Sequence, residues 1–197
     1  MGREILNNIQ SCFVSPPNCK IVNPGRHIQY IVMHTIEDAE TSGGAMATAE
    51  YFKGGGDGRH VSAHYCVSDK DIVQCVQTKD IANAAPGANR NGIHIEMVGR
   101  AEQTAVQWQD AFSLETMKNA AWLIGQVLVP KFLVPVEFIT ADQIRAGVDN
   151  TLIRGITTHW EVTKSGIRPG NHTDPGPNWP MTQFMSYCRQ AVIGTLS

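Results

Sequence analysis

The sequence lacks the features that mark several large classes of protein. It has no excess of basic residues, because 16 Lys and Arg stand against 18 Asp and Glu, for a net charge of -2. Nothing in this balance favours nucleic acid or an anionic membrane surface as a partner. No apolar run approaches the length of a membrane-spanning helix, so membrane insertion is not expected. A neutral or small substrate is compatible with this composition.

Markers of export and of several domains are also missing. The first residues contain no apolar run of signal-peptide length, which predicts synthesis in the cytosol without the usual export signal. There is no repeat, low-complexity tract or charge run that would mark a linker, and 197 residues fit one globular domain. We predict an N-terminal arm over residues 1–27 and a single domain over 28–197, with a monomer favoured although oligomeric state is not indicated.

The five cysteines are odd in number and have no Cys-x-x-Cys spacing, so neither a disulfide framework nor a structural zinc cluster is indicated. Cys66 and Cys75 lie in apolar strand-like runs and are predicted to be small core residues. Cys12 and Cys19 could bridge in an oxidising environment, and the sequence leaves this open.

Strand-like and helix-like segments alternate along the chain. Apolar, β-branched runs predict strands at residues 28–34, 62–67, 72–77, 92–98 and 136–139. Apolar residues at helical spacing predict helices at residues 45–52, 114–128, 141–146 and 184–196. Pro130 is expected to close the second of these helices, and the last is expected to pack on the sheet. This alternation predicts an α/β fold with a central mixed β-sheet flanked by helices.

The stretch from Thr158 to Trp179 combines two metal-ligand side chains with a rigid turn. His159 and Asp174 are strong ligand types, and Pro-Gly-Pro follows the aspartate, which fixes φ on either side of a permissive glycine. This indicates a stiff elbow that holds one carboxylate in place, although an aspartate before Pro-Gly also begins ordinary turns. A catalytic zinc site needs three protein ligands and an open position for water, so the third ligand must come from far away.

Two more polar side chains occur where strands would otherwise be apolar. His34 closes the first predicted strand, at a position where α/β proteins commonly keep their sites. Glu96 lies within the strand over 92–98, where a carboxylate is costly to bury unless it is paired, metal-linked or protonated. Alternation places His94 on the same face as Glu96, although this is also the pattern of a solvated strand face. Taken alone, His34 is likewise more often a satisfied core or edge histidine.

Together these residues make a more specific constellation. His34, His159 and Asp174 would complete a zinc site of two histidines and one carboxylate with a vacant fourth position. Glu96 would then be the free carboxylate beside it. Zinc lowers the pKa of its bound water to near 7, and a nearby carboxylate can take the proton as that water attacks a carbonyl. We therefore predict one Zn²⁺ per chain and a hydrolytic reaction.

Five segments with these residues follow one another in the order Ile-Val-Met-His-Thr (31–35), Val-Ser-Ala-His-Tyr (61–65), Gly-Ile-His-Ile-Glu-Met-Val-Gly (92–99), Thr-His-Trp-Glu-Val (158–162) and Thr-Asp-Pro-Gly-Pro (173–177). In this order they resemble the zinc-dependent N-acetylmuramoyl-L-alanine amidases of the type 2 class, which include phage endolysins, bacterial muropeptide amidases and peptidoglycan-recognition proteins. The Pro-Pro-Asn at 16–18 and the missing signal sequence look most like phage members.

The resemblance implies the single-domain fold of that class and a role for each site residue. His34, His159 and Asp174 match the zinc ligands, and Glu96 matches the glutamate assigned to base catalysis. His172 falls where many members have a lysine that supports the developing oxyanion. A histidine can donate there, but its charge depends on pH near neutrality, and it could also be an ordinary loop histidine.

The resemblance also has implications for His64 and for residues 83–87. His64 matches a position usually internal to the fold and is expected to be structural. Residues 83–87 lack the Trp-His pair found there in many members, which implies a changed wall of the substrate cleft.

The resemblance implies that peptidoglycan is the substrate, and that the amide between N-acetylmuramic acid and the L-alanine of the stem peptide is cleaved. It also implies a phage endolysin, made in the host cytoplasm and released to the cell wall through a separate membrane-pore protein. Two alternatives remain open: a non-catalytic peptidoglycan-binding module, and a zinc peptidase or deacetylase of other specificity.

Overall fold

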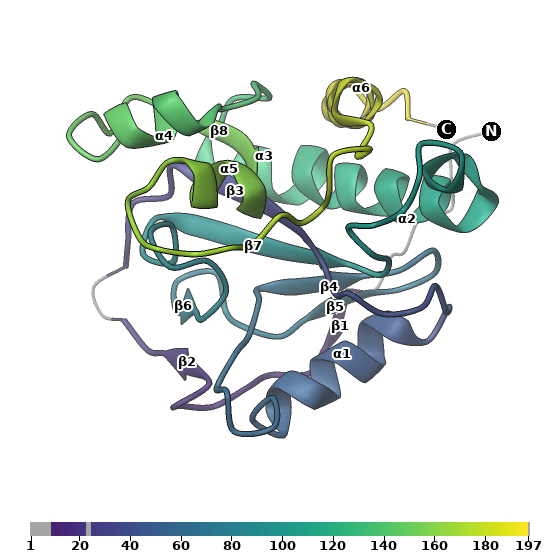
Figure 1. Cartoon of the computed structure of the whole chain (residues 1–197), viewed down its shortest axis with the longest axis horizontal. Coiled ribbons are helices and arrows are strands. Elements are labelled where there is room, and N and C mark those ends of the chain that lie inside the picture. The colour runs from purple at the N-terminus through teal and green to yellow at the C-terminus, as the bar shows by residue number, and fades with distance from the viewer. Residues whose placement is uncertain (1–8, 23–24, 197) are drawn as a thin grey trace.

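A six-stranded mixed sheet forms the centre of the molecule (Figure 1). The computed structural model describes residues 9–22 and 25–196, so residues 1–8 and 23–24 of the predicted arm lie outside the described part. The strands follow the spatial order β1-β5-β4-β7-β3-β8, and all neighbours are parallel except β4 and β5. Their bounds are β1 Gln10–Ser11, β3 Tyr30–Thr35, β4 Tyr65–Val67, β5 Ile72–Gln74, β7 Gly92–Met97 and β8 Gly155–Thr158. This confirms the predicted fold class.

Within the predicted arm, two short segments pair with the rest of the chain. β1 joins the edge of the main sheet, and β2 (Cys19–Lys20) forms a two-stranded antiparallel sheet with β6 (Ile81–Ala82). All five cysteines are buried free thiols, and the Sγ atoms of Cys66 and Cys75 lie 3.6 Å apart. In the described part of the chain, no helix is long and apolar enough to cross a membrane.

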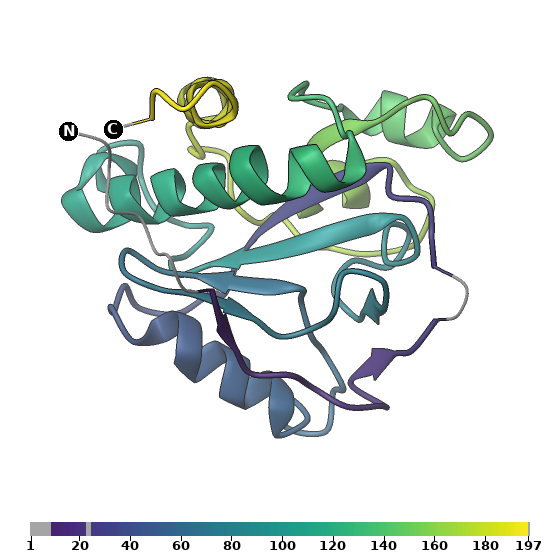
Figure 2. The same cartoon turned by 180° about the vertical axis from the view of Figure 1, so that it is seen from behind.

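Helices cover both faces of the sheet (Figures 1 and 2). α1 packs over β4 and β5 on one face, and α2 packs over β4 and β7 on the other. The helices are α1 Gly44–Lys53, η1 Gln107–Gln109, α2 Ala111–Trp122, the π-helical η2 Leu123–Leu128, α3 Val129–Phe132, α4 Ala141–Ala146, α5 His159–Lys164 and α6 Met181–Val192. The predicted segment 136–139 contributes one isolated bridge, between Phe138 and Ile156.

Side chains alternate between these two faces, as the period of a strand requires. In β7, Ile93, Ile95 and Met97 join the main apolar core, which also receives Met117 and Ile124 from the α2 side. The intervening side chains of β3 and β7 point to the α1 face. One face of the central strands therefore supplies the main core, and the opposite face carries smaller apolar clusters, one of which includes Val32 of β3, together with the polar side chains of His34, His94 and Glu96.

The prediction that Pro130 closes the long helix is wrong. The helix continues through η2 into α3 and ends at Leu133, which has left-handed backbone at φ 54°. The π-helical turns shift the backbone hydrogen-bond register, so that Pro130 falls in the first turn of α3. The missing N–H of Pro130 therefore interrupts the hydrogen-bond ladder at the junction of η2 and α3 without ending the helix.

The C-terminal helix is present, but its expected packing on the sheet is corrected by the structure. α6 packs against α2 and η2, which separate it from the strands (Figure 2). Phe184 and Cys188 are fully buried in this helix–helix contact. Gly125 permits a close approach of the two helices, since a Cβ added to it would lie 2.6 Å from the Cβ of Ala191 and 2.8 Å from the backbone nitrogen of Val192.

We expect Gly125→Ala to destabilise the fold, because its methyl group would force α6 away from η2. Overpacking of this kind costs about 1–3 kcal/mol, against a gain of up to about 1 kcal/mol from replacing a helical glycine. Urea unfolding of Gly125→Ala should give a lower midpoint than that of the natural protein. Gly43→Ala is the matched control, because a Cβ there meets nothing within 4 Å. Equal midpoints for the two variants would contradict the packing argument.

Candidate metal centre

The central strands place His34 and Glu96 side by side. His34 lies near the end of β3, and its Cα partner on the parallel strand β7 is Glu96. Register partners on neighbouring strands project to the same face, so both side chains lie on the α1 side of the sheet. The two predicted site residues from the first half of the chain are therefore brought together.

The third residue, His159, is positioned by the junction between β8 and α5. β8 is the neighbour of β3, and α5 begins directly after it at His159. The hydroxyl of Thr158 caps this helix by accepting a hydrogen bond from the backbone N–H of Glu161 at 3.1 Å. Such a cap fixes where the helix starts, and so it fixes the direction of the His159 side chain. The ring of His159 lies 4.7 Å from that of His34 between centroids.

Asp174 is held over these histidines by its own loop. The backbone N–H of Trp160 donates to the carbonyl of Asp174 at 2.9 Å, which ties the loop to α5. Gly176 follows with φ +100°, a conformation that favours glycine. A Cβ at this position would also collide with the backbone carbonyl of Ala101, so the loop packs directly on the segment after β7. The stiff Asp-Pro-Gly-Pro elbow expected from the sequence therefore has two anchors.

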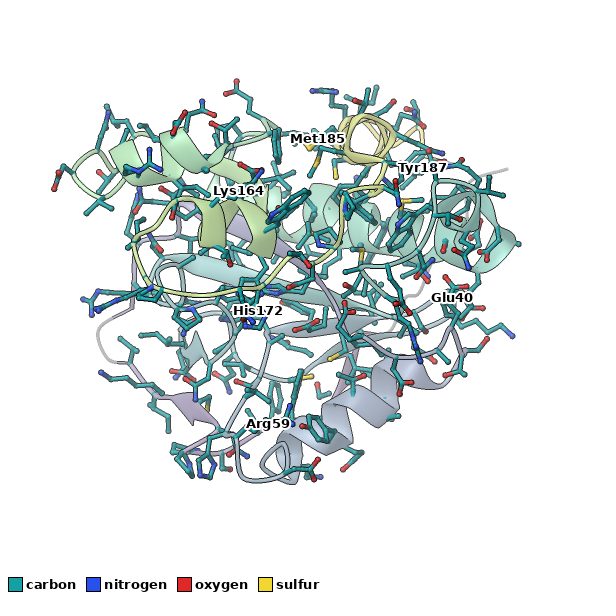
Figure 3. All side chains as sticks on the ribbon, in the orientation of Figure 1. Glu40, Arg59, Lys164, His172, Met185 and Tyr187 are labelled. Atoms are coloured by element: carbon teal, nitrogen blue, oxygen red, sulfur yellow. The ribbon has the colours of Figure 1, made fainter. Side chains whose placement is uncertain are left out.

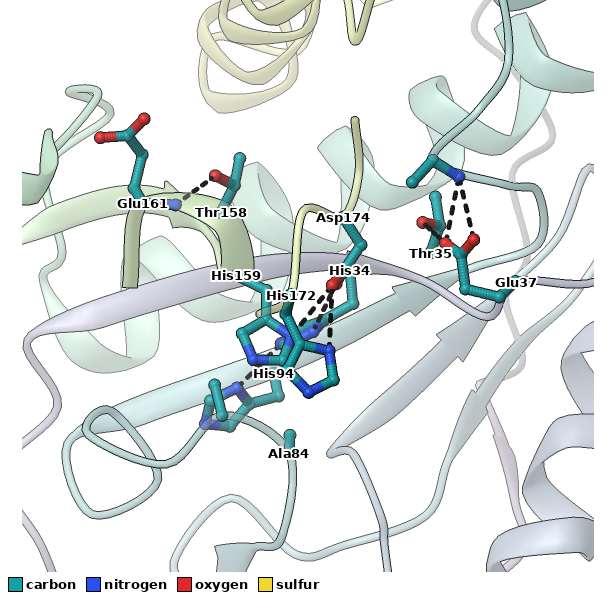
Figure 4. A network of polar contacts seen from close by, with 12 residues as sticks. His34, Thr35, Glu37, Ala84, His94, Thr158, His159, Glu161, His172 and Asp174 are labelled. Atoms are coloured by element: carbon teal, nitrogen blue, oxygen red, sulfur yellow. Dashed lines mark hydrogen bonds and ion pairs between the residues drawn. The ribbon is translucent and has the colours of Figure 1, made fainter. Parts of the chain in front are cut away.

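Three buried side chains meet at a common centre (Figure 4). Asp174 Oδ2 lies 3.1 Å from His34 Nδ1, and Asp174 Oδ1 lies 3.1 Å from His159 Nδ1. The potential ligand atoms of the three residues all lie within 4.8 Å of one another, and each residue is less than 10% exposed. Two imidazole nitrogens and one carboxylate oxygen form a donor set that suits a transition metal with an open coordination position. This cluster could therefore hold a metal ion.

The charge distribution around Asp174 also suits a cation. Burial alone would raise the pKa of Asp174, but hydrogen bonds from His159 and His34 more than offset it and hold the pKa below its usual range. Burial lowers the pKa of His159, although its hydrogen bond to Asp174 acts in the opposite direction. Asp174 is thus ionised and His159 is biased towards its neutral form, and these are the forms in which both residues bind metals.

Glu96 has a different environment from Asp174. Burial raises the pKa of Glu96 well above its ordinary value, and the negative charges of Asp174 and Glu37 raise it further. Its Oε2 atom is buried, and no described residue forms a hydrogen bond with it. A carboxylate that is unpaired and destabilised as an anion is a ready proton acceptor.

His172 reaches the same centre from the exposed side. Its ring stacks on that of His159 with centroids 4.0 Å apart and planes at 18°, and its Nδ1 lies 3.6 Å from Asp174 Oδ1. The side chain is 56% exposed. Burial and the neighbouring His159 lower the pKa of His172. His172 therefore flanks the three clustered ligand atoms and faces solvent.

These side chains line one cleft of about 540 Å³. His34, Glu96, His159, His172 and Asp174 all contribute to its surface. α1 supplies much of the facing wall, and residues 83–84 of the loop that lacks Trp-His line it as well. Figure 3 shows His172 under α5 and Arg59 near the end of α1, two positions on the rim of this cleft.

Two residues near the centre received no role from the sequence. Glu37 lines the cleft with left-handed backbone at φ 60°, and its carboxylate accepts hydrogen bonds from the Thr35 hydroxyl at 2.5 Å and from the Ala101 N–H at 3.0 Å. No sequence pattern signals such a backbone conformation at a glutamate.

His94 is fully buried and contacts His34, so the prediction that it lies on a solvated strand face is wrong. The sequence pattern that could have identified His94 is the strand alternation that places it on the same face as Glu96.

Comparisons with known proteins agree with this architecture. The family described as N-acetylmuramoyl-L-alanine amidase matches residues 24–177. No curated protein matches the chain. Among solved structures, the Staphylococcus aureus hydrolase AmiA, in complex with its ligand, is 15% identical with a TM-score of 0.67 and covers 96% of this chain and 87% of its own.

Two further solved structures are similar over nearly their whole length. A mutant endolysin from Bacillus subtilis is 20% identical with a TM-score of 0.61, covering 92% of this chain and 98% of its own. The N-acetylmuramoyl-L-alanine amidase LysC from Clostridium intestinale is 14% identical with a TM-score of 0.58, covering 92% and 99%. At these identities the structures establish the fold alone. The match over residues 24–177 shows more, and on that ground the chain belongs to the N-acetylmuramoyl-L-alanine amidase family of enzymes.

Proposed function

We propose that this protein uses a bound zinc ion to hydrolyse the amide between the lactyl group of N-acetylmuramic acid and the L-alanine of the stem peptide. One observation carries the proposal. A buried cluster of His34, His159 and Asp174 stands beside the unpaired carboxylate of Glu96 in an open cleft. The family match supports peptidoglycan as the substrate.

The residues of the cluster fit zinc by their chemistry. Zinc binds nitrogen and oxygen donors and is usually four-coordinate. Three protein ligands therefore leave one coordination position open, as in catalytic sites. When bound, the ion supplies Lewis acidity, which polarises a carbonyl oxygen and lowers the pKa of a water molecule. His34, His159 and Asp174 would hold it.

Glu96 is proposed to act as the general base. The raised pKa of Glu96 lies closer to the pKa of the proton donor than an ordinary glutamate pKa would. This favours efficient proton transfer near neutral pH. After accepting the proton from water, its carboxyl group would pass the proton to the amine of the leaving L-alanine. His172 would donate a hydrogen bond to the oxyanion that forms at the attacked carbonyl. Its exposed position beside His159 allows contact with a bound substrate.

We further propose that the protein acts as a phage endolysin. The similarity to a Bacillus subtilis endolysin structure supports this role. The chain would be made in the host cytoplasm and would reach the wall through a pore formed by a separate protein. The division into an arm over residues 1–27 and an amidase domain over 28–197 belongs to the same proposal.

Digestion of purified peptidoglycan tests the reaction. We expect one zinc per chain by elemental analysis, together with release of free L-alanine amines and no new reducing ends. Cleavage within the stem peptide or loss of acetyl groups would instead favour a zinc peptidase or deacetylase. Metal without any cleavage would favour a binding module. A protein that holds no metal at neutral pH would overturn the proposed site.

Replacement of Glu96 by alanine should separate catalysis from metal binding. We expect Glu96→Ala to retain zinc and the fold but to lose about 100- to 10,000-fold in turnover, the usual contribution of a general base. His34→Ala is the contrasting variant, because it should lose zinc as well as activity. Normal turnover by zinc-loaded Glu96→Ala would remove its assigned role, and a full equivalent of zinc in His34→Ala would show that the ligand set is wrong.

The charge of Glu37 should contribute to the acid limit of activity, after the larger effects of burial and of Asp174 on the pKa of Glu96. Glu96 must be ionised to accept a proton, so kcat/KM should fall as pH drops through its raised pKa, above the ordinary glutamate value of about 4.3. Glu37→Gln removes a negative charge that raises this pKa, and the acid limb should move to lower pH. Asp38→Asn is the control on the same cleft, since its side chain is 76% exposed and its charge is screened by solvent. A larger shift in the control would contradict this account.

A further inference from the structure

A row of buried imidazoles extends from the metal centre into the protein. His34 Nε2 lies 3.1 Å from His94 Nδ1 (Figure 4). The ring of His94 stacks on that of His64, with centroids 5.7 Å apart and planes at 15°. The three side chains come from different segments of the chain, and His64 and His94 are fully buried.

The contacts of His34 determine which of its nitrogens carries the proton when a metal is bound. Its Nδ1 faces Asp174, whose carboxylate belongs to the same ligand cluster. A neutral imidazole has one N–H group and one nitrogen with a free lone pair. If Nδ1 gives its lone pair to the metal, then Nε2 carries the proton, and the atom in front of it is Nδ1 of His94. That nitrogen must therefore be the acceptor.

The ring of His94 makes this contact at a cost. With Nδ1 as the acceptor, its proton lies on Nε2, and no described residue forms a hydrogen bond with that buried nitrogen. A buried polar group without a partner costs about 1–3 kcal/mol. Such an exception calls for an explanation, and the contact that the ring does make is with a predicted metal ligand.

His64 fixes the position of His94 from the other side. The backbone N–H of His94 donates to His64 Nδ1 at 3.0 Å, so Nδ1 acts as an acceptor, and Nε2 of the same ring lies between the carbonyl of Asp80 and the Arg26 guanidinium. Burial and the nearby Arg26 guanidinium lower the pKa of His64 to about 3, which keeps the ring neutral. The structural role expected for His64 is therefore to hold the backbone and the ring plane of His94 in place.

We propose that His94 is a positioning residue of the metal centre, whose Nδ1 accepts a hydrogen bond from His34 Nε2–H and thereby fixes the tautomer and the ring orientation of that ligand. This inference rests on the proposed function, because it requires a metal at His34. Metal-bound histidines usually donate their second N–H to a carboxylate, a carbonyl or water. A neutral imidazole does the same here without adding another negative charge beside Glu96 and Asp174.

Two variants of similar size test the proposal. His94→Asn keeps a side-chain oxygen that can accept a hydrogen bond near the position of Nδ1, whereas His94→Leu keeps the volume and removes the acceptor. We expect His94→Leu to bind zinc about 10- to 100-fold more weakly in competition with a chelator, as for other partners of metal ligands. His94→Asn should retain most of the affinity. His27→Leu, at an exposed histidine, is the control for nonspecific zinc binding.

The outcomes separate this proposal from the proposed function. If His94→Leu binds zinc as tightly as the natural protein, or His94→Asn loses as much affinity as His94→Leu, the positioning role is overturned while zinc-dependent cleavage stands. If the natural protein neither binds zinc nor releases amines, the proposed function itself fails. Should His94→Leu not fold, ¹⁵N NMR of the zinc-loaded natural protein decides. A scalar coupling between His34 Nε2 and His94 Nδ1 across the hydrogen bond supports the role, and its absence refutes it.

Discussion

The carboxylate of Asp174, buried between two histidines, is the constraint on which the rest of the site depends. An ionised carboxylate is costly to remove from water unless charges or hydrogen-bond donors surround it. Its partners lie 140 and 15 residues away in the sequence, so they meet only when β3 and β8 are neighbours in the sheet. The loop that carries Asp174 is held by the N–H of Trp160 and by the close packing of Gly176 on Ala101. The order of the strands, the start of α5 and the conformation of the loop thus together position Asp174 and its two histidine partners.

The two carboxylates of the cleft show how neighbouring groups acquire different properties. Hydrogen bonds from His34 and His159 hold the pKa of Asp174 low, whereas burial and the charges of Asp174 and Glu37 raise that of Glu96. Pairs of titratable groups whose pKa values are pushed apart are typical of acid–base sites. The difference follows from position, since Asp174 faces imidazoles and Glu96 Oε2 has no partner among the described residues. The same arrangement suits Asp174 to a cation and Glu96 to a proton.

Much of this arrangement follows from patterns that a sequence carries directly. Strict alternation in β7 places Ile93 and Ile95 on the opposite face from Glu96. The Pro-Gly-Pro after Asp174 predicts a fixed turn. Other features depend on tertiary context. Pro130 is accommodated because η2 shifts the hydrogen-bond register, and α6 meets η2 because Gly125 permits close approach. Local propensity cannot anticipate either, since both depend on what packs against the segment.

Polar residues in an otherwise apolar strand are the hardest to interpret, and His94 shows why. Alternation alone says that it shares a face with Glu96, but not whether that face meets water or protein. The answer comes from residues outside the strand, because His64 stacks on its ring and His34 covers Nδ1. Burial lowers the pKa of His94 and of His64, and the neighbouring histidines lower that of His94 further, so these two rings are neutral. His94 therefore places a neutral ring, and not a cation, beside the histidine of the metal cluster.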